Sequence, residues 1–184
     1  MATLVALFAL PVAIMFGGGA KAAGQVPGQP VPQNALPVSV DATTGFAIAG
    51  FDPVSYFTDG RPRAGDPLNL ARWHDAAWIF ANPGNQQAFD AHPELYAPRF
   101  GGFSVVSLAR GHYASGNPEL YVMHKGGVLL FHTPQQIAVF NEAPDEFVAM
   151  AEAEWRRMNG LPEPKPEKKV EPTSPDAPAP DIFN

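Results

Sequence analysis

Five histidines and Met123 are the side chains best suited to metal chemistry in this sequence. The histidines are His74, His92, His112, His124 and His132, and no two of them stand at the i, i+4 or His-x-His spacing of a chelating pair. A predicted hairpin turning at Gly126-Gly127 would place His124 and His132 on opposite faces, or about 13 Å apart along one face, according to the turn length. Because thioethers and imidazoles suit copper, the alternative is a copper site in which Met123 joins His112 or His132. Apart from copper, the sequence indicates no cofactor.

Hydroxyl and carboxyl side chains form no catalytic set. Ser104 and Ser107 precede His112, but no strained nucleophile turn surrounds them and no acid stands at a useful spacing, so they are interpreted as ordinary strand serines. Asp52 precedes a proline and is typical of a turn or capping residue. Its alternative role is a pocket carboxylate beside Tyr56, which lacks the second acid that general acid–base catalysis needs. The sequence therefore predicts no catalytic residue, and an enzyme is the least favoured interpretation.

The run Arg99-Phe100-Gly101-Gly102-Phe103 holds two glycines between aromatic residues. Glycine permits a positive φ or a very close approach of the backbone to another group, so a bulge or tight packing is the favoured interpretation. The functional alternative is a shallow pocket in which Arg99 receives an anionic ligand. The candidate residues for binding a ligand or partner are therefore Asp52, Tyr56, Arg99, Gly101, Gly102 and Ser104.

Composition limits the classes of function. The 184 residues carry a net charge of −6 and no cluster of lysine and arginine, so a nucleic-acid partner is not expected. There are no cysteines, which excludes disulfides, zinc–thiolate sites, iron–sulfur clusters and a thiol nucleophile. Many of the 21 prolines lie near the two ends, and residues 46–160 between them are enough for one domain with its own core.

The first 22 residues are predicted to export the chain. Residues 1–20 carry no charged side chain, and an apolar run leads to Ala20 and Ala22 at the −3 and −1 positions of a cleavage site. The alternatives are an uncleaved anchor, although Pro11 and a glycine run shorten the apolar stretch to about 13 residues, and a buried core helix. We expect a periplasmic or secreted protein. An uncleaved segment would instead make the chain a subunit anchored to a membrane complex, and membrane contact is expected only in that case.

The hydrophobic pattern predicts an α+β domain at residues 46–160, between a flexible linker at 23–45 and a disordered, Pro-rich tail at 161–184. Hairpins are predicted at residues 68–80 and 120–131, and an apolar run at 103–108 is consistent with a strand. Helices are predicted from Pro83 and from Pro134, where Thr133 and Gln136 would form a capping box, with a break at Pro144 and an end at Asn159-Gly160. No internal repeat is visible.

Several blocks of residues stand in an order and spacing that point to one family. They are Gly50-Phe51-Asp52-Pro53-Val54-Ser55-Tyr56-Phe57-Thr58-Asp59-Gly60, then Trp78-Ile79-Phe80-Ala81-Asn82 with Asn85 and Phe89, and His92-Pro93-Glu94-Leu95-Tyr96-Ala97-Pro98 continuing into Arg99-Phe100-Gly101-Gly102-Phe103. Over residues 48–110, and more weakly to 155, the chain resembles the YHS-domain family, in particular its exported single-domain members. The resemblance implies a small α+β domain. Some members carry cysteines thought to bind metal, and exported members usually have one directly after Gly-Gly-aromatic, where this chain has Ser104, so that role does not carry over.

The sequence therefore favours a non-enzymatic, exported YHS-type binding or accessory module. Such a module would hold a small ligand or a partner protein around Tyr56, Arg99 and Ser104. Periplasmic copper handling through His and Met side chains is the alternative.

Overall fold

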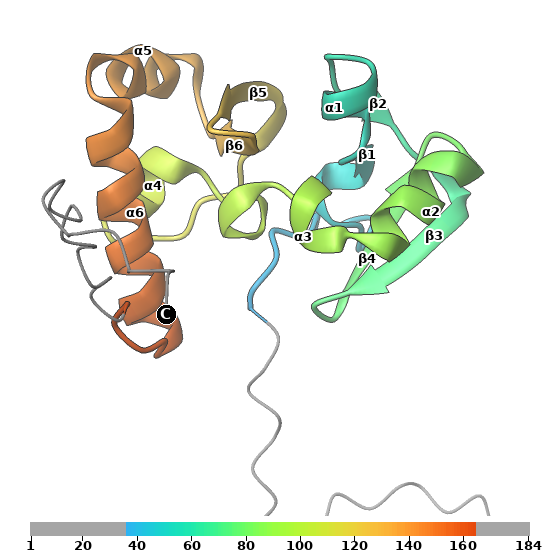
Figure 1. The fold of residues 1–184 in the computed structure, drawn as a ribbon, viewed down its shortest axis with the longest axis horizontal. Helices are drawn as coiled ribbons and strands as arrows, with labels where there is room; N and C mark the ends of the chain where they lie inside the picture. Colours follow the sequence, from blue (N-terminus) through green and yellow to red (C-terminus); the bar gives the residue numbers. More distant parts are fainter. Residues whose placement is uncertain (1–35, 165–184) are drawn as a thin grey trace, which may run out of the picture. The chain divides into compact units, whose positions relative to one another are not determined.

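The computed structural model describes residues 36–164, which form an α+β fold of antiparallel hairpins and helices, as the sequence predicts (Figure 1). The predicted leader and most of the predicted tail lie outside these residues. The elements are η1 (Ile48–Gly50), β1 (Phe51–Asp52), α1 (Ser55–Thr58), β2 (Arg63–Ala64), β3 (Asp66–Trp73), β4 (Ala76–Phe80), α2 (Pro83–Ala91), α3 (Pro93–Tyr96), η2 (Arg99–Gly102), α4 (Val105–Ala109), β5 (Asn117–His124), β6 (Gly127–Phe131), α5 (Pro134–Glu142) and α6 (Pro144–Asn159). Among these helices, none is both long and apolar enough to span a bilayer.

The strands form three two-stranded antiparallel sheets, β1–β2, β3–β4 and β5–β6, and the last two confirm the predicted hairpins. Their turns are His74-Asp75 and Lys125-Gly126, and all four residues have positive φ, as a type I′ turn requires. The second turn therefore lies one residue earlier than predicted. Because it has two residues, strand alternation directs His124 and His132 to opposite faces.

The predicted helix boundaries are confirmed where a local residue sets them. Asn82 caps α2, with its Oδ1 accepting from Asn85 N at 2.9 Å, and Pro83 is the first helical residue. Pro144 separates α5 from α6, and Gly160 ends α6 in the left-handed conformation with φ 62°.

Two local predictions were wrong, and both concern the region where the Gln136 side chain meets Ser104 and Ser107. Residues 103–108 form no strand but contain α4, which Ser104 caps by accepting from Ser107 N at 3.4 Å. All of α4 is buried, and a short, fully buried apolar run lacks the periodicity that separates a helix from a strand. The capping box is also not formed, because Thr133 makes no side-chain capping bond, and the Gln136 side chain bonds to Ser104 and Ser107 and accepts from His132 N at 2.9 Å, not from Thr133 N.

The folded part begins before the predicted boundary at residue 46. Ser39 is buried and its N–H donates to Gly101 O at 2.8 Å, and Val40 forms a β-bridge with Ala47. Leu36 N donates to His74 Nδ1 at 2.9 Å. Residues 36–40 therefore contact the domain, so the flexible linker predicted at 23–45 does not extend through them.

An internal repeat, which the sequence did not reveal, organises the fold. Residues 48–96 and 100–147, named here repeat 1 and repeat 2, run through equivalent elements in the same order (Figure 1), except that the sheet β1–β2 of repeat 1 is reduced to the single bridge Phe103↔Ser115 in repeat 2. Each begins with consecutive positive-φ residues that end in a glycine, Gly50 or Gly102, and continues into a Phe, a buried polar residue and a short helix. A hairpin and a helix that starts at proline follow in each.

The two hairpins share their register, residue for residue, at an offset of 51. The pairs of β3–β4 are Asp66↔Phe80, Leu70↔Ile79, Ala71↔Trp78, Arg72↔Ala77 and Trp73↔Ala76, and those of β5–β6 are Asn117↔Phe131, Tyr121↔Leu130, Val122↔Leu129, Met123↔Val128 and His124↔Gly127. Both registers shift at the same place, and each hairpin is preceded by a glycine whose N–H donates to the glycine at the start of its repeat, Gly65 to Gly50 at 2.9 Å and Gly116 to Gly102 at 3.0 Å. Chance would not reproduce both the register and the irregularity.

Each repeat also has its own hydrophobic core, built from equivalent positions. The first core contains Val54, Tyr56, Trp78, Phe80 and Phe89, and the second contains their counterparts Val106, Leu108, Leu129, Phe131 and Phe140. β6 lies between the two cores and is buried on both faces, because Val128 and Leu130 pack into the first core while Leu129 and Phe131 pack into the second. The repeats therefore cannot separate without exposing this strand.

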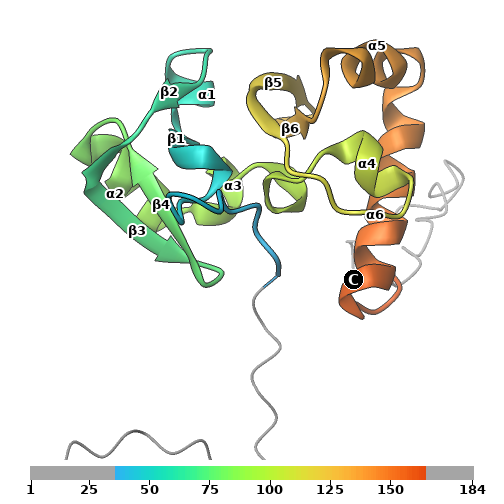
Figure 2. The same cartoon turned by 180° about the vertical axis from the view of Figure 1, so that it is seen from behind.

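The repeats differ most in the helix that closes each one. Repeat 1 ends with the four-residue α3, whereas α6, which begins in repeat 2 and continues beyond it to Asn159, has 16 residues and packs along α4 (Figure 2). Ala151 and Trp155 on α6 are buried in the second core, and Phe147 and Met158 pack against it, as their helical spacing predicts.

Candidate functional site

Asp52 is a fully occupied structural carboxylate. It is 0% exposed, and its Oδ1 accepts from Val54 N at 2.8 Å. Its Oδ2 accepts from Ala81 N at 2.9 Å and from Asn85 Nδ2 at 2.6 Å. The carboxylate thus joins the turn before α1 to the end of β4 and the first turn of α2, and this confirms a turn role while leaving no side directed at a cleft.

Tyr56 is also buried, at 2% exposure, and its hydroxyl donates to Pro118 O at 2.8 Å. Its ring lies edge-on to Tyr121, with 4.9 Å between centroids. Burial raises the pKa of the phenol well above its ordinary value, with smaller contributions from Tyr121 and Asp52. Tyr56 therefore stays a neutral donor that ties repeat 1 to the start of β5.

Ser104 is the counterpart of Asp52 in repeat 2 and is likewise 0% exposed. Its Oγ donates to Gln136 Oε1 at 2.7 Å, and Gln136 Nε2 donates to Ser107 Oγ at 3.1 Å. Gln136 occupies the position that Asn85 has in repeat 1, so an amide in the first turn of the hairpin-following helix bonds to the buried polar residue in both repeats. Asp52, Tyr56 and Ser104 all belong to the interior of the fold.

The glycine run makes a close backbone crossing. Phe100, Gly101 and Gly102 have φ values of 57°, 62° and 82°. A Cβ on Gly101 would lie 2.1 Å from Pro37 O, and one on Gly102 would lie 2.6 Å from Ile48 Cγ2. The expected tight packing is thus present: the run lets residues 37–39 cross η2, and it leaves Arg99 on the outer side.

Arg99 is the predicted candidate whose side chain borders a cleft, together with the backbone of Gly101, and it borders two clefts that share Arg99, Phe100 and Trp155. The first has a volume of about 160 Å³ and is also lined by Leu36, Pro37, Val38, Trp73, His74, Glu94, Ala97, Pro98 and Gly101. The second, of about 260 Å³, is also lined by Glu152, Arg156 and Leu161. We name the two together the Arg99 cleft. One part is walled by aromatic rings and prolines, and the other by charged groups.

The Arg99 guanidinium makes only weak interactions with the rest of the chain. It pairs with Glu152 on α6, and its Cζ lies 5.2 Å from the centroid of the Phe100 ring. The Arg99 and Glu152 side chains are 30% and 38% exposed, and an ion pair so accessible to water contributes only about 0–1 kcal/mol. An anionic group from outside could therefore replace Glu152 at little cost in stability.

The residues of the copper alternative have separate neighbours. Met123 is 42% exposed on β5, and His112 lies in the exposed loop after α4. His132 Nδ1 hydrogen-bonds with Ser115 O at 2.9 Å. Across residues 36–164, no three His, Asp or Glu side chains gather where they could hold a metal ion. A copper site through Met and His stays a prediction that these contacts do not favour.

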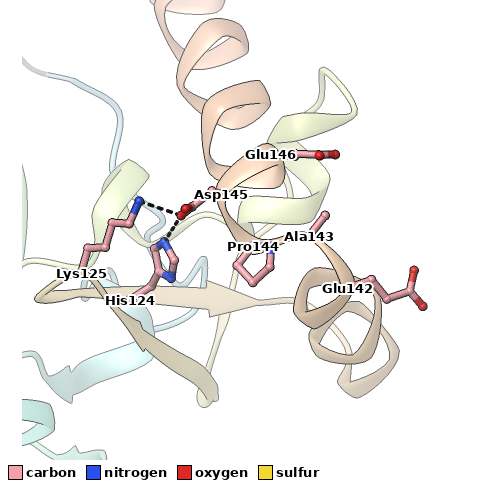
Figure 3. A pocket seen from close by; sticks show the side chains of 7 residues that line it. All are labelled: His124, Lys125, Glu142, Ala143, Pro144, Asp145 and Glu146. Carbon is pink, nitrogen blue, oxygen red and sulfur yellow. Dashed lines mark hydrogen bonds and ion pairs between the residues drawn. The ribbon is translucent and has the colours of Figure 1, made fainter.

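Another cleft, of about 350 Å³, lies elsewhere, at the tip of the β5–β6 hairpin. Asp145 in the first turn of α6 accepts from Lys125 Nζ at 2.8 Å and hydrogen-bonds with His124 Nε2 at 2.9 Å, while Glu142 and Glu146 point away from this pair (Figure 3). The notch is wide open, and its central groups are already joined to one another. We therefore assign the candidate site to the Arg99 cleft.

Sequence reasoning missed the partners of Arg99. Trp73, His74, Glu94, Trp155 and Glu152 come from β3, its turn, α3 and α6, and no spacing unites them. The repeat relates three of these residues to positions in the second half of the domain. Trp73 and His74 are the counterparts of His124 and Lys125, and Glu94 is the counterpart of Asp145. The aromatic part of the Arg99 cleft and the notch in Figure 3 thus occupy equivalent places in the two repeats.

Comparison with known proteins yields no relative: no family model, no curated protein and no solved structure matches this chain.

Proposed function

We propose that this chain is an exported binding or accessory module of the YHS type that holds an apolar, anion-bearing segment of a partner in the Arg99 cleft. The observation that carries the proposal is the pairing of an aromatic recess with an arginine whose own ion pair is about one-third exposed to solvent. The partner is a protein or peptide, since the cleft continues along α6 as an open surface.

The size of the aromatic recess supports one anchoring side chain. A cavity of about 150 Å³ is enough to admit a benzene ring, and the recess beside Trp73 and Trp155 measures about 160 Å³. Binding sites on proteins commonly combine such an apolar anchor with a few polar groups at its rim. Here Arg99 and Arg156 stand at the rim of the adjoining part, where a carboxylate beside the anchor would meet them.

The interior candidates support a module without chemistry of its own. Asp52 and Ser104 have their hydrogen-bonding groups occupied, and burial raises the pKa of Tyr56 away from a useful range. The charged and titratable groups that line the cleft are Arg99, Arg156, His74, Glu94 and Glu152, which can recognise a ligand, and neither lining as described includes a Ser, Thr or Lys side chain.

Selection from a random peptide library displayed on phage, against the full chain, tests the proposal. We expect enriched peptides that carry an aromatic or branched apolar residue next to an acidic one, and that bind Arg99→Ala about tenfold more weakly, which corresponds to 1.4 kcal/mol. Arg99→Lys should bind with intermediate strength, because it keeps the charge and loses the planar fork.

The matched control is Arg110→Ala, an exposed arginine at the end of α4 that lines neither part of the cleft. It should bind the selected peptides as the unchanged chain does. Peptides whose affinity is insensitive to Arg99→Ala, or equally reduced by Arg110→Ala, would overturn the proposal, as would a failure to enrich any peptide.

A further inference from the structure

The chain leaves the described part of the structure beside the Arg99 cleft. Leu161 follows the last turn of α6, lines the charged part of the cleft, and is 37% exposed. Three residues later, Pro164 is the last described residue. Whatever follows Pro164 therefore starts within a few residues of Arg156 and Trp155, which line the same cleft.

Residues 165–184 contain one segment whose chemistry matches the cleft. Their large apolar residues are Val170, Ile182 and Phe183, and Phe183 is their one aromatic residue. Asp181 stands directly before Ile182 and Phe183, so a carboxylate adjoins the apolar pair. The basic residues Lys165, Lys168 and Lys169 all lie in the first five positions of this stretch, away from that segment.

We infer that residues 181–183 of the same chain occupy the Arg99 cleft, with the Phe183 side chain in the aromatic recess and Asp181 toward Arg99 and Arg156. This inference rests on the proposed function, because it names the first occupant of the same site. In this arrangement residues 181–183 cover the cleft, so that an outside partner has to displace them.

The tether length makes such a contact accessible even if it is weak. Phe183 stands 19 positions after Pro164, and at 3.3–3.6 Å per residue it cannot be farther from Pro164 than about 65 Å. Confinement to that radius gives an effective concentration of about 1 mM or more. A segment that binds in trans with a Kd of about 1 mM would therefore already occupy its own cleft for about half of the time.

The test compares two full-length chains with one probe. The probe is a fluorescent, amidated peptide of residues 176–184, and the open variant is Ile182→Ala/Phe183→Ala. We expect fluorescence anisotropy to show the probe binding the open variant at least about twofold more tightly than the unchanged chain, in which residues 181–183 compete for the cleft. Adding Arg99→Ala to the open variant should weaken the probe again by about fivefold or more.

Val170→Ala is the matched control, since it removes an apolar residue of the same stretch outside the segment and should behave as the unchanged chain does. Equal affinity of the open variant and the unchanged chain would overturn the inference, and so would a probe that binds neither. Competition that increases with protein concentration would place the segment on a second copy and overturn the intramolecular assignment. If the phage-selected peptides still bind in an Arg99-dependent way in any of these cases, the proposed function survives alone; if they do not, both fail.

Discussion

Repeat 1 and repeat 2 share one backbone fold but carry different side chains. Comparing equivalent positions separates the side chains that the fold requires from those that can vary. Both need a buried polar residue before the short helix and an amide to bond it, supplied as Asp52 with Asn85 and as Ser104 with Gln136. Both need an aromatic ring on the helix that follows the hairpin, Phe89 or Phe140. These positions serve folding, although several of them were the first candidates for function.

The hairpin tips are where the two repeats diverge. The ring that meets the helix phenylalanine is Trp73 in repeat 1, 6.0 Å from Phe89, and His124 in repeat 2, 5.9 Å from Phe140. In repeat 2 the tip is bonded to Asp145, whereas the tip of repeat 1 lines an apolar recess with Glu94 at its edge. The two repeats thus differ at the tip of repeat 1, and there, together with Arg99, we propose that a partner binds.

The largest contrast is expected from the two buried polar positions. Asp52→Ala removes an ionised acceptor from three donors in the interior, and each bond to a charged group is worth about 1.5–3 kcal/mol, so we expect a loss of about 3 kcal/mol or more. Ser104→Ala removes a cap and one neutral bond and should cost about 1–2 kcal/mol. Urea unfolding of both variants measures the difference.

Asp41→Ala is the control for this pair, because Asp41 accepts comparable bonds from Thr43 N and Thr44 N in an exposed turn, where water can replace it. Its loss should stay below about 1 kcal/mol. Equal destabilisation by Asp52→Ala and Ser104→Ala would show that the two positions are not distinguished by charge, contrary to this account.

A second contrast compares Gly101 with its counterpart in repeat 1, Ala49. Ala49 already has φ 53° with a Cβ in place, whereas a Cβ on Gly101 would lie 2.1 Å from Pro37 O. Gly101→Ala should therefore cost about 2–3 kcal/mol through strain and backbone displacement, while Ala49→Gly should be neutral or stabilise by up to about 1 kcal/mol. Gly60→Ala, with φ 63° and open space, is the control for the φ term alone. If Gly101→Ala destabilises the chain no more than Gly60→Ala does in thermal unfolding, the close approach of Gly101 to Pro37 is contradicted.

The smallest effect concerns the closed tip of repeat 2. The hydrogen bond from Lys125, followed by that from His124, lowers the pKa of Asp145 below its ordinary value of 3.8. A carboxyl whose pKa is lowered in the folded state contributes stability above the unfolded pKa, and loses that contribution as the pH falls through the folded pKa. We expect the carbon NMR titration of Asp145 to report a value below 3.8, and Lys125→Ala to raise it. An unchanged titration in Lys125→Ala would show that the pair is not formed in solution.

Local chemistry made part of this architecture predictable. Helix boundaries are set by local residues at Asn82-Pro83, Pro144 and Gly160, and the three boundaries predicted there are confirmed. Asp52 before a proline was correctly interpreted as a turn residue. Its remaining partners, Ala81 and Asn85, lie 29 and 33 positions away, and no local pattern indicates them.

The repeat was not visible because it is carried by backbone geometry more than by side chains. Equivalent residues of the two repeats are 52 positions apart up to α1 and α4, and 51 positions apart from the hairpins onward, because the following loops differ in length by one residue. A single fixed offset therefore aligns only part of each repeat. The fully buried run at Val105–Ala109 similarly hid its helical period. The sequence suggested a pocket at Arg99 but not its other lining residues, because Trp155 joins it from a helix 56 positions farther along the chain.

The most direct test of the account is to map a phage-selected peptide on the chain by backbone NMR. We predict that shifts on titration concentrate at Trp73, Arg99, Phe100, Trp155 and Leu161, while Asp52, Tyr56 and Ser104 move little. Shifts centred on the buried Asp52 and Ser104 positions, or on the His124–Asp145 notch, would contradict the assignment of binding to the Arg99 cleft.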